Sequence, residues 1–405
     1  MRVLVVSQYY WPETFRITEV VQALRDEGCE MLVLTGQPNY PDGVPFKGYS
    51  WWSVGVEQHD GVTIFRVPLF PRGNGRALRL LLNYLSFILC ATVFGSWLLR
   101  GRPIDKLFVF GLSPILQAIP AIWLARFKKA SLVTWIQDLW PESLSAAGFV
   151  HNPKLLVAVS WLVEWIYRKN DLLLVQSRAF IEPVRAMAGN TPVLYHPNPG
   201  DFAFSDSDVG AKCPLGFGSG FNVVFAGNLG TVQSLETIIG AAELLLDEKD
   251  ITLILVGSGS RSEWLKSEIA RRNLSNVRLP GRFPLSAMPS IMSSASALLV
   301  SLVRNKIINQ TVPSKVQAYL AAGKPIIASL DGEGASVILE AGAGIASAAE
   351  DVFGLACAIR KLRDSPTHVL EEMGENARAY YENHFEPRFL ARNLKEALLA
   401  TRTKR

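Results

Sequence analysis

The sequence predicts an α/β protein made of two doubly wound domains in tandem. Short, continuous runs of Val, Ile and Leu alternate with segments of helical periodicity along most of the 405 residues, a pattern typical of parallel strands that helices cover on both faces. A cluster of chain-breaking residues from His196 to Asp201 divides this series in two. We therefore expect two Rossmann-like domains whose sheets present their carboxyl ends to a cleft.

The first series assigns residues 1–200 to an N-terminal domain. Its expected strands are Val3–Ser7, Met31–Thr35, Thr63–Val67, Lys106–Phe110, Ser131–Ile136, Leu172–Gln176 and Val193–Tyr195. Met1 leads directly into the first of these strands, so the sequence does not begin with the pattern of a signal peptide.

The second series assigns residues 201–375 to a C-terminal domain. Its expected strands are Asn222–Ala226, Thr252–Val256, Asn276–Leu279, Ala297–Leu302, Pro325–Ser329 and Ala343–Ile345. Residues 376–405 form a separate, charged and amphipathic helical stretch that is interrupted near Pro387.

Composition indicates membrane contact or deeply buried sheets, because 49% of the residues are hydrophobic and the mean hydropathy is +0.19. The net charge of +5 is small for this length and the basic residues form no long block, which argues against nucleic acid as a partner but suits an anionic lipid surface. The four cysteines have no metal or redox spacing and indicate a reducing compartment.

An apolar run from Leu80 to Leu99 contains no charged residue and is preceded by Arg79 and followed by Arg100. Its length would allow it to cross a bilayer. The alternatives are a long buried helix between the third and fourth strands, or a helix that lies on the membrane. We disfavour a spanning helix because strands resume at Lys106. A second stretch, Leu155–Tyr167, combines tryptophans with following cations, as interfacial helices do.

Polar residues follow several strands of the N-terminal domain. Arg16, near the start of a helix, would meet a phosphate or an acidic group, or would simply be a surface arginine. Asn39 lies in the loop after the second strand. Gln137, Asp138 and Glu142 follow the strand that ends at Ile136, and two carboxylates at a strand end suit acid–base chemistry. Asp138 could alternatively cap a helix.

Glycine-containing loops follow the strands of the C-terminal domain. The first has the sequence AGNLGTVQSLE and contains Gly227, Asn228, Gly230 and Gln233, so its N–H groups could approach a diphosphate. Gly257 and Arg282 follow the next two strands.

The segment Val312–Gly344 carries the strongest phosphate-binding signal. Ser314 and Lys315 open a helix, where a hydroxyl, an ammonium and free N–H groups converge. The alternative is that Ser314 merely caps this helix. Glu333 and Gly334 lie in a further flexible loop.

Together these residues carry a resemblance that covers nearly the whole chain. The segments that carry it include WPETFRITEV, QDLWPESLSAAG, FAGNLGTVQSLETII, PSKVQAYLAAGKPIIA and GEGASVILEAGAG. The chain resembles the retaining glycosyltransferases of family 4, which have the GT-B fold. It is most similar to the WbuB-like enzymes, which resemble N-acetyl-L-fucosamine transferases of surface-polysaccharide biosynthesis.

The resemblance implies a UDP-sugar donor, carrying an N-acetylated deoxyhexosamine, in the C-terminal domain. It implies a polyprenyl-diphosphate-linked saccharide acceptor in the N-terminal domain, in O-antigen, capsule or exopolysaccharide biosynthesis. The protein would be peripheral or monotopic on the cytoplasmic face of the inner membrane, and residues 376–405 would return to the N-terminal domain. No metal and no cofactor are expected.

The sequence departs from the family pattern at several positions. Asn228 and Gln233 stand where the family commonly has an arginine and a lysine, and Gln310 and Ala318 stand at the two glutamates of the Glu-x7-Glu motif. Phe15 and Arg16 lie where a Gly-Gly pair is common.

We therefore assign stabilisation of the leaving diphosphate to Lys315 and to the backbone from Gly227 to Gly230. Asp138 is the candidate for orienting or deprotonating the acceptor hydroxyl, and Glu142 or Glu333 for contacting sugar hydroxyls. Two other functions stay open at this point: a UDP-sugar epimerase, and a membrane-associated assembly subunit without activity. Sugar release without an acceptor would favour the first, and donor binding without turnover the second.

Overall fold

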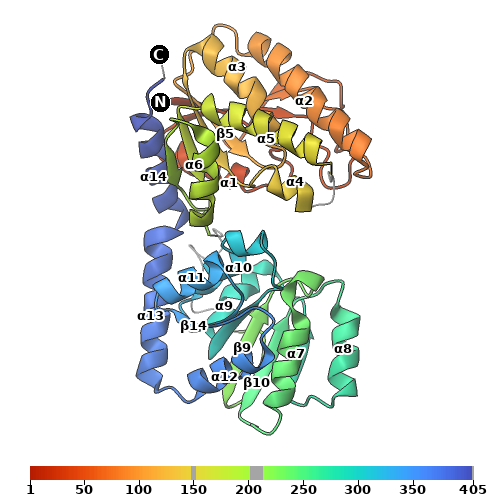
Figure 1. The fold of residues 1–405 in the computed structure, drawn as a ribbon, viewed down its shortest axis with the longest axis vertical. Helices are drawn as coiled ribbons and strands as arrows, with labels where there is room; N and C mark the ends of the chain where they lie inside the picture. The colour runs from red at the N-terminus through yellow and green to blue at the C-terminus, as the bar shows by residue number, and fades with distance from the viewer. Residues whose placement is uncertain (147–151, 201–212, 404–405) are drawn as a thin grey trace. The chain divides into compact units, whose positions relative to one another are not determined.

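The computed structural model describes residues 1–146, 152–200 and 213–403, which divide into two compact units (Figure 1). The N-terminal unit comprises residues 1–197 and 390–405, and the C-terminal unit residues 198–389. The first division lies close to the expected one, but the second falls at 389/390 and not at 375/376. The reason is that Ala377 and Tyr381, on the penultimate helix, are buried in the core of the C-terminal unit.

The N-terminal unit contains an eight-stranded sheet in the order β3-β4-β2-β1-β5-β6-β7-β8. The strands are β1 (Arg2–Val6), β2 (Glu30–Gly36), β3 (Gly55–His59), β4 (Val62–Val67), β5 (Lys106–Gly111), β6 (Ser131–Ile136), β7 (Leu172–Val175) and β8 (Val193–Tyr195). All pair in parallel except β3, which is antiparallel to β4 at the edge. We did not expect β3, because its sequence GVEQH has no continuous apolar run and none of its residues is buried.

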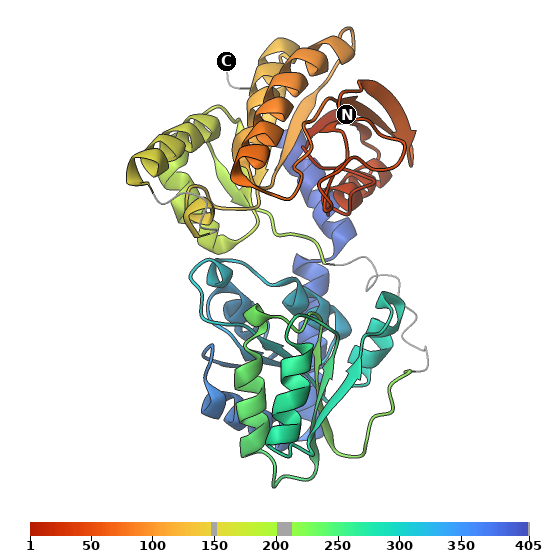
Figure 2. The same cartoon turned by 90° about the vertical axis from the view of Figure 1, so that its right-hand side faces the viewer.

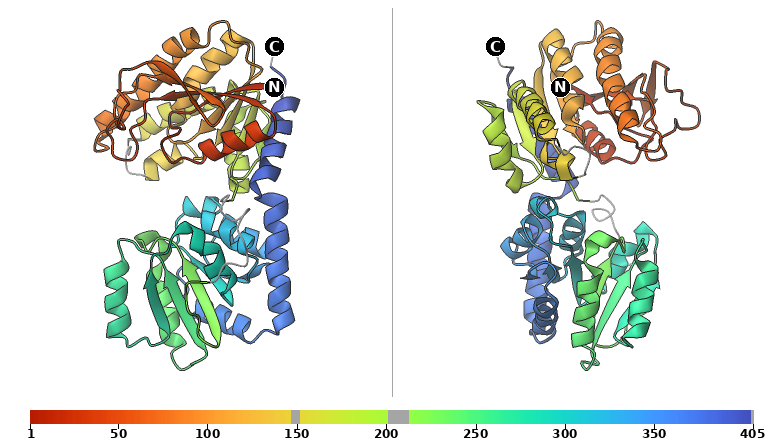
Figure 3. Two further views of the ribbon diagram at one scale, coloured as in Figure 1. Left: turned by 180° about the vertical axis from the view of Figure 1, so that it is seen from behind. Right: turned by 45° about the vertical axis from the view of Figure 1, so that its right-hand side comes forward.

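Helices cover both faces of this sheet. They are α1 (Ile17–Asp26), α2 (Ala77–Leu98), α3 (Ala118–Lys128), α4 (Glu142–Ala146), α5 (Pro153–Arg168), α6 (Ile181–Ala188) and α14 (Pro387–Ala400). The core on one face is completed by α2, α3, α5 and α6, and the core on the other face by α1 and the end of α14 (Figure 3, left). Leu394 and Leu398 of α14 are fully or almost fully buried there.

The C-terminal unit contains a six-stranded, fully parallel sheet in the order β11-β10-β9-β12-β13-β14. Its strands are β9 (Phe221–Ala226), β10 (Ile251–Val256), β11 (Val277–Gly281), β12 (Ala297–Ser301), β13 (Ile326–Ser329) and β14 (Gly344–Ser347). All six expected strands are present, and each end lies within two residues of the expected one. The strand order reverses between β9 and β12, and at such a switch point the loops after the two strands diverge and form the ligand-binding crevice of a doubly wound sheet.

The helices of the C-terminal unit also form two layers (Figure 2). They are α7 (Leu235–Leu244), α8 (Ser262–Arg271), α9 (Met288–Ser293), α10 (Ser314–Ala322), α11 (Glu333–Glu340), α12 (Val352–Arg363) and α13 (Thr367–His384). One core contains residues of α9, α10, α11 and α13, and the other contains residues of α7, α8 and α12.

The apolar run of the N-terminal unit forms α2, which is neither fully buried nor free. It is long and apolar enough to cross a membrane by length and composition, and 22% of its apolar window is buried. The buried residues Leu80, Asn83, Phe87, Ala91 and Gly95 form one stripe at helical spacing. The interpretation as a wholly buried helix is therefore wrong, because α2 packs through this stripe and exposes most of its remaining apolar side chains.

Candidate active site

Lys315 lies at the switch point of the C-terminal sheet. It follows β12 at the start of α10, and its side chain reaches β9, where Nζ stands 3.6 Å from the centre of the Phe225 ring and donates to Gln233 Oε1 at 2.5 Å. Burial lowers the pKa of this ammonium to about 7. In the described parts of the chain no ion pair joins Lys315 to a carboxylate, and desolvation is the cause of its lowered pKa.

Glycines let the neighbouring loops approach this lysine and one another. A Cβ on Gly227 would stand 2.6 Å from Lys315 Cε, and a Cβ on Gly257 would stand 1.8 Å from the Gly227 carbonyl oxygen. The Gly227 and Leu229 N–H groups donate to the β10 strand and loop, at Val256 O and Ser258 O. These two N–H groups are therefore occupied, which leaves those of Asn228 and Gly230 as the backbone donors that could face a diphosphate.

The starts of α10 and α11 meet beside this crevice. A Cβ on Gly334 would stand 2.8 Å from Pro313 Cδ, and a Cβ on Gly332 would stand 2.0 Å from Asn309 O. Glu333 is the first residue of α11 and is partly buried. The Ser314 hydroxyl does not cap α10, because the N-cap position is held by Pro313 without a side-chain hydrogen bond. The structure thus brings Gly227, Gln233, Ser314, Lys315 and Gly334 to one edge of one sheet.

Two other predicted residues of this unit, and Ala318 at the second position of the Glu-x7-Glu motif, lie in different surroundings. Arg282 is exposed after β11, and Gln310 is partly buried at the end of a short turn before α10. Ala318 is partly buried and packs against the apolar core of this unit. Arg304, a further cation of this region, is bound to Asp331 and to the Ala349 carbonyl group.

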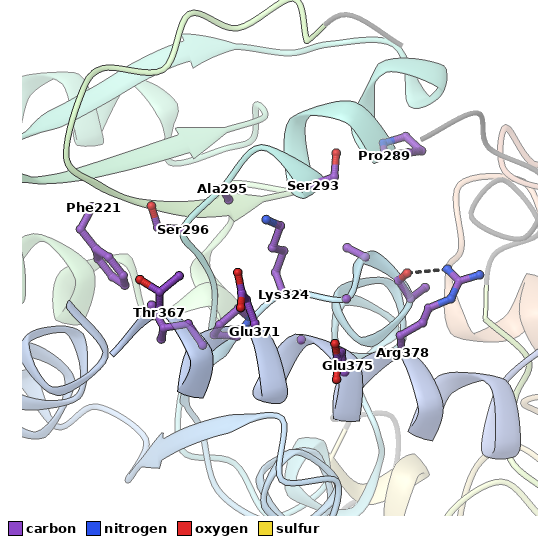
Figure 4. Close-up of a pocket in the computed structure, with 16 residues that line it drawn as sticks. Phe221, Pro289, Ser293, Ala295, Ser296, Lys324, Thr367, Glu371, Glu375 and Arg378 are labelled. Carbon is purple, nitrogen blue, oxygen red and sulfur yellow. Dashed lines mark hydrogen bonds between the residues drawn. The ribbon is translucent and has the colours of Figure 1, made fainter. Parts of the chain in front are cut away.

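A pocket of about 870 Å³ lies at the opposite edge of the same sheet (Figure 4). Its wall includes Phe221, Ser296 and Pro325, which stand at the amino ends of β9, β12 and β13. Lys324 points into it, and burial lowers the pKa of this lysine as well. We do not place the active site there, because ligands of doubly wound sheets bind outside the carboxyl ends of the strands.

In the N-terminal unit, the predicted carboxylate Asp138 follows β6 and is partly buried. Its Oδ2 accepts hydrogen bonds from the Ser113 N–H group at 3.0 Å and from the Ser113 hydroxyl at 2.9 Å, while Trp140 Nε1 donates to the Ser113 hydroxyl oxygen at 2.9 Å. Asp138 therefore fixes the loop after β5 and does not cap a helix. Glu142 is exposed at the start of the short helix α4.

The remaining predicted residues of this unit occupy different positions. Gln137 is buried, and its carbonyl group accepts from Gln176. Asn39 is also buried, and its amide binds the Gln37 carbonyl group and the Arg72 N–H group, so it holds loops together. Arg16 precedes α1 and is partly buried.

Glu13, which was not among the predicted site residues, organises the same loops. This buried carboxylate accepts the N–H groups of Asn39 at 2.8 Å, Tyr40 at 2.7 Å and Tyr10 at 3.3 Å. Burial raises the pKa of Glu13 to about 7 even though these hydrogen bonds favour its ionised form.

A second buried network crosses the switch point of the N-terminal sheet, between β1 and β5. Gln117 Oε1 accepts the Gln8 N–H group at 2.9 Å, and Gln8 Nε2 donates to Asn83 Oδ1 at 2.6 Å. Asn83 Nδ2 in turn donates to the Phe70 carbonyl oxygen at 2.6 Å. This network ties α2 to the carboxyl end of β1.

Comparison with known proteins decides what such a pair of domains belongs to. A family model described as glycosyl transferases group 1 matches residues 220–365, and one described as a glycosyl transferase 4-like domain matches residues 14–199. The chain is a family 4 glycosyltransferase with the GT-B fold.

Two curated relatives resemble this glycosyltransferase over most of their length. The putative colanic acid biosynthesis glycosyl transferase WcaI of Escherichia coli is 26% identical over 341 residues, which are 80% of this chain and 82% of that one. The probable glycosyltransferase WbjE of Pseudomonas aeruginosa is 25% identical over 293 residues, 68% of this chain and 70% of that one.

Solved structures share the fold of this glycosyltransferase at low identity. A glycosyltransferase from Rickettsia africae has a TM-score of 0.70 and 12% identity, covering 98% of this chain and 97% of that one. Anabaena HepE, in complex with UDP, has a TM-score of 0.66 and 15% identity, covering 99% and 100%.

The geometry explains how this glycosyltransferase differs from the common family pattern. The resemblance places Gln233 where the family commonly has a lysine, and the Lys315 ammonium donates a hydrogen bond to the side chain of Gln233. The loop after β9 has no lysine at Gln233, and Lys315 of α10 places its positive charge beside this residue instead. Within residues 1–146, 152–200 and 213–403, no group of three or more His, Cys, Asp or Glu side chains is arranged to hold a metal ion.

Proposed function

We propose that this glycosyltransferase moves an N-acetylated deoxyhexosamine, with retention, from a UDP-sugar to a polyprenyl-diphosphate-linked saccharide in O-antigen, capsule or exopolysaccharide biosynthesis. The name of the relative WcaI refers to biosynthesis of such a polysaccharide, colanic acid. UDP is bound in the HepE structure, and UDP-2-fluoro glucose in an Escherichia coli trehalose-6-phosphate structure of the same fold. We propose that the acceptor lipid lies in the inner membrane, at its cytoplasmic face, and that transfer needs no metal.

The observation that carries this proposal is the unpaired Lys315 ammonium at the switch point. Its burial is unfavourable in the free protein, which is why its pKa falls to about 7. A diphosphate in the crevice would supply the missing counter-charge, and the N–H groups of Asn228 and Gly230 would add donors.

The chemistry follows from that charge. As the bond between the sugar C1 and the diphosphate breaks, its electron pair moves to the diphosphate oxygen, and Lys315 stabilises the charge that develops there. The acceptor oxygen bonds to C1 and loses its proton, and Asp138 is the candidate that orients this hydroxyl or takes the proton. Removing one positioned hydrogen-bond donor to such a developing charge costs about 2.7–4 kcal/mol.

The test compares two partly buried lysines of the same unit. Lys315→Ala should lower kcat for transfer into a lipid fraction by about 10²–10³-fold and weaken UDP binding. Lys324→Ala, at the opposite edge of the sheet, is the matched control and should bind UDP and transfer sugar as the unsubstituted protein does. Near-normal kcat together with unchanged UDP affinity in Lys315→Ala would contradict the proposal.

A donor panel with isolated membranes separates this activity from an epimerase. Incorporation of labelled sugar into the lipid fraction, persisting when a chelator is added, is the expected result. Isomerised UDP-sugar without lipid labelling would identify an epimerase instead.

A further inference from the structure

The helical layer on one face of the N-terminal unit has an apolar outer surface. In Figures 1 and 2, α2 and α3 lie side by side in orange, and α3 also packs against α5. The outward apolar side chains of this layer, here called the α2–α3–α5 face, are Leu78, Leu81, Leu82, Leu85, Leu89, Val93, Trp97, Trp123, Phe127, Leu155, Val157, Trp161, Leu162 and Trp165. Trp161 is 79% exposed and Trp97 65%, which is unusual for tryptophan in a protein that remains in water.

The buried stripe of α2 argues against a helix that crosses the bilayer. Phe87 and Ala91 are fully buried in the core, and Asn83 holds Gln8 through a hydrogen bond. A helix that crossed a bilayer would have to pull these residues out of the core. At about 1.5 Å per residue, α2 instead offers a rod of roughly 33 Å that lies flat with one side toward the sheet and the other side outward.

Positive charge surrounds the α2–α3–α5 face, and neither α2 nor α3 contains an acidic residue. The exposed cations at the helix ends are Arg76, Arg79, Arg100, Arg102, Arg126, Lys129, Lys154, Arg168 and Lys169. Glu164, the one acidic residue of α5, is bound to Arg168. Leucine and tryptophan on one side with arginine and lysine at the margins match the apolar interior and anionic headgroups of a bilayer.

We propose that the α2–α3–α5 face docks on an anionic bilayer, with α2 lying in the plane of the membrane. This deepens the proposed function, on which it rests for the biological reason to bind lipid, by naming the surface that meets the membrane carrying the acceptor. The network Gln117–Gln8–Asn83 then has a further consequence, because it joins the docked helix to the carboxyl end of β1. This connection fixes the bilayer plane relative to the carboxyl edge of the N-terminal sheet, where Gln8 follows β1.

The experiment is flotation of the purified full-length protein with vesicles of phosphatidylcholine alone or mixed with phosphatidylglycerol. The unsubstituted protein should float with the anionic vesicles. The variant Leu85→Gln, Leu89→Gln, Trp97→Gln, Trp161→Gln should bind them at least about tenfold more weakly. The variant Arg76→Gln, Arg100→Gln, Lys169→Gln should lose about 100-fold on anionic vesicles, at about fivefold per charge, and little on neutral ones.

The matched control removes equally exposed apolar residues from the C-terminal unit. Leu339 and Phe353 are 57% and 71% exposed, and the variant Leu339→Gln, Phe353→Gln should float as the unsubstituted protein does. UDP binding should be unchanged in all these variants, so that a failure of docking is distinguished from a failure of donor binding.

Several results would overturn the proposal. One is an absence of flotation with either vesicle, and another is equal flotation of the four-residue apolar variant. A third is a soluble dimer, measured by light scattering, that this variant dissociates, since the face would then be a protein interface. Bound protein that resists extraction at alkaline pH would show that α2 spans the bilayer and does not lie in it.

Discussion

The carboxyl edges of the two sheets are built in different ways although both belong to doubly wound domains. In the C-terminal unit the edge is backbone packed on backbone: Gly257 lies directly on Gly227, and a single lysine supplies the charge. In the N-terminal unit the edge is held by buried side chains, among them Glu13 and Gln8, each bonded to residues distant in sequence. Glycine loops allow close approach to the diphosphate of a nucleoside-diphosphate sugar, whereas side-chain networks can define a particular acceptor.

The largest effect that we expect from changing either edge is the loss of transfer activity when Asp138 is substituted. Asp138→Asn keeps an oxygen that can accept from Ser113 but loses the base, so kcat should fall by about 10²–10⁴-fold. Ser113→Ala is the matched control: it removes the hydroxyl tether, keeps the carboxylate and should retain most of the transfer. Transfer within about twofold of normal in Asp138→Asn would remove the base role.

Breaking the backbone edge should cost folding stability. Gly257→Ala places a Cβ 1.8 Å from Gly227 O at a φ of +141°, so we expect a loss of about 3 kcal/mol or more in the free energy of unfolding, and loss of UDP binding. Gly218→Ala, where nothing lies within 4 Å of the added Cβ, should be close to neutral. Chemical denaturation and UDP titration measure both. A stability within about 1 kcal/mol of normal for Gly257→Ala would mean that the two loops are not rigidly packed.

The side-chain edge should respond to pH through Glu13. The pKa of this carboxyl is raised from 4.5 to about 7 in the folded protein, so its contribution to stability is present below about pH 4.5 and is lost as the pH rises to about 7. The loss amounts to about 3 kcal/mol at most. Glu13→Gln should remove this part of the pH dependence when urea unfolding is measured from pH 4.5 to 8. Parallel curves for the two proteins would show that Glu13 does not titrate in this range.

The smallest expected effect concerns the pH dependence of donor binding. Because the pKa of Lys315 is about 7 in the free protein, its neutral form must take up a proton when a diphosphate binds at higher pH. UDP affinity should therefore fall by about tenfold per pH unit above 7.5. Calorimetry in buffers of different ionisation enthalpy would report the proton uptake, and Lys315→Met should abolish it. A flat affinity from pH 7 to 9 would mean that Lys315 is already charged.

The strands could be predicted because parallel strands buried on both faces must be continuously apolar, as Leu253 to Val256 illustrate. The edge strand β3 was not predicted because none of its residues is buried and its sequence has the pattern of a loop. The length of α2 could be predicted from its apolar run. Which of its sides faces the sheet could not, since a sequence that is apolar on every side does not specify it.

The position of Lys315 on the first turn of α10 could be predicted, because the local sequence indicates where this helix begins. Glu13 and Asn83 were not, because their partners lie far away in sequence: Asn39 is 26 residues from Glu13, and Gln8 is 75 residues from Asn83. A single polar side chain inside an apolar run gives no sign that it is buried and bonded. The close contact of Gly227 with Gly257 likewise depends on the pairing of β9 with β10.

The division of the N-terminal unit into two chain segments has a consequence for synthesis. Leu394 and Leu398 complete the core beside α1, but they leave the ribosome only after all of residues 198–389. The C-terminal unit can thus finish folding while the earlier one still lacks part of its core. A nascent chain that stops before Leu390 would lack Leu394 and Leu398 and leave a gap in the core that they share with α1, which a quality-control protease or chaperone would encounter as exposed hydrophobic surface.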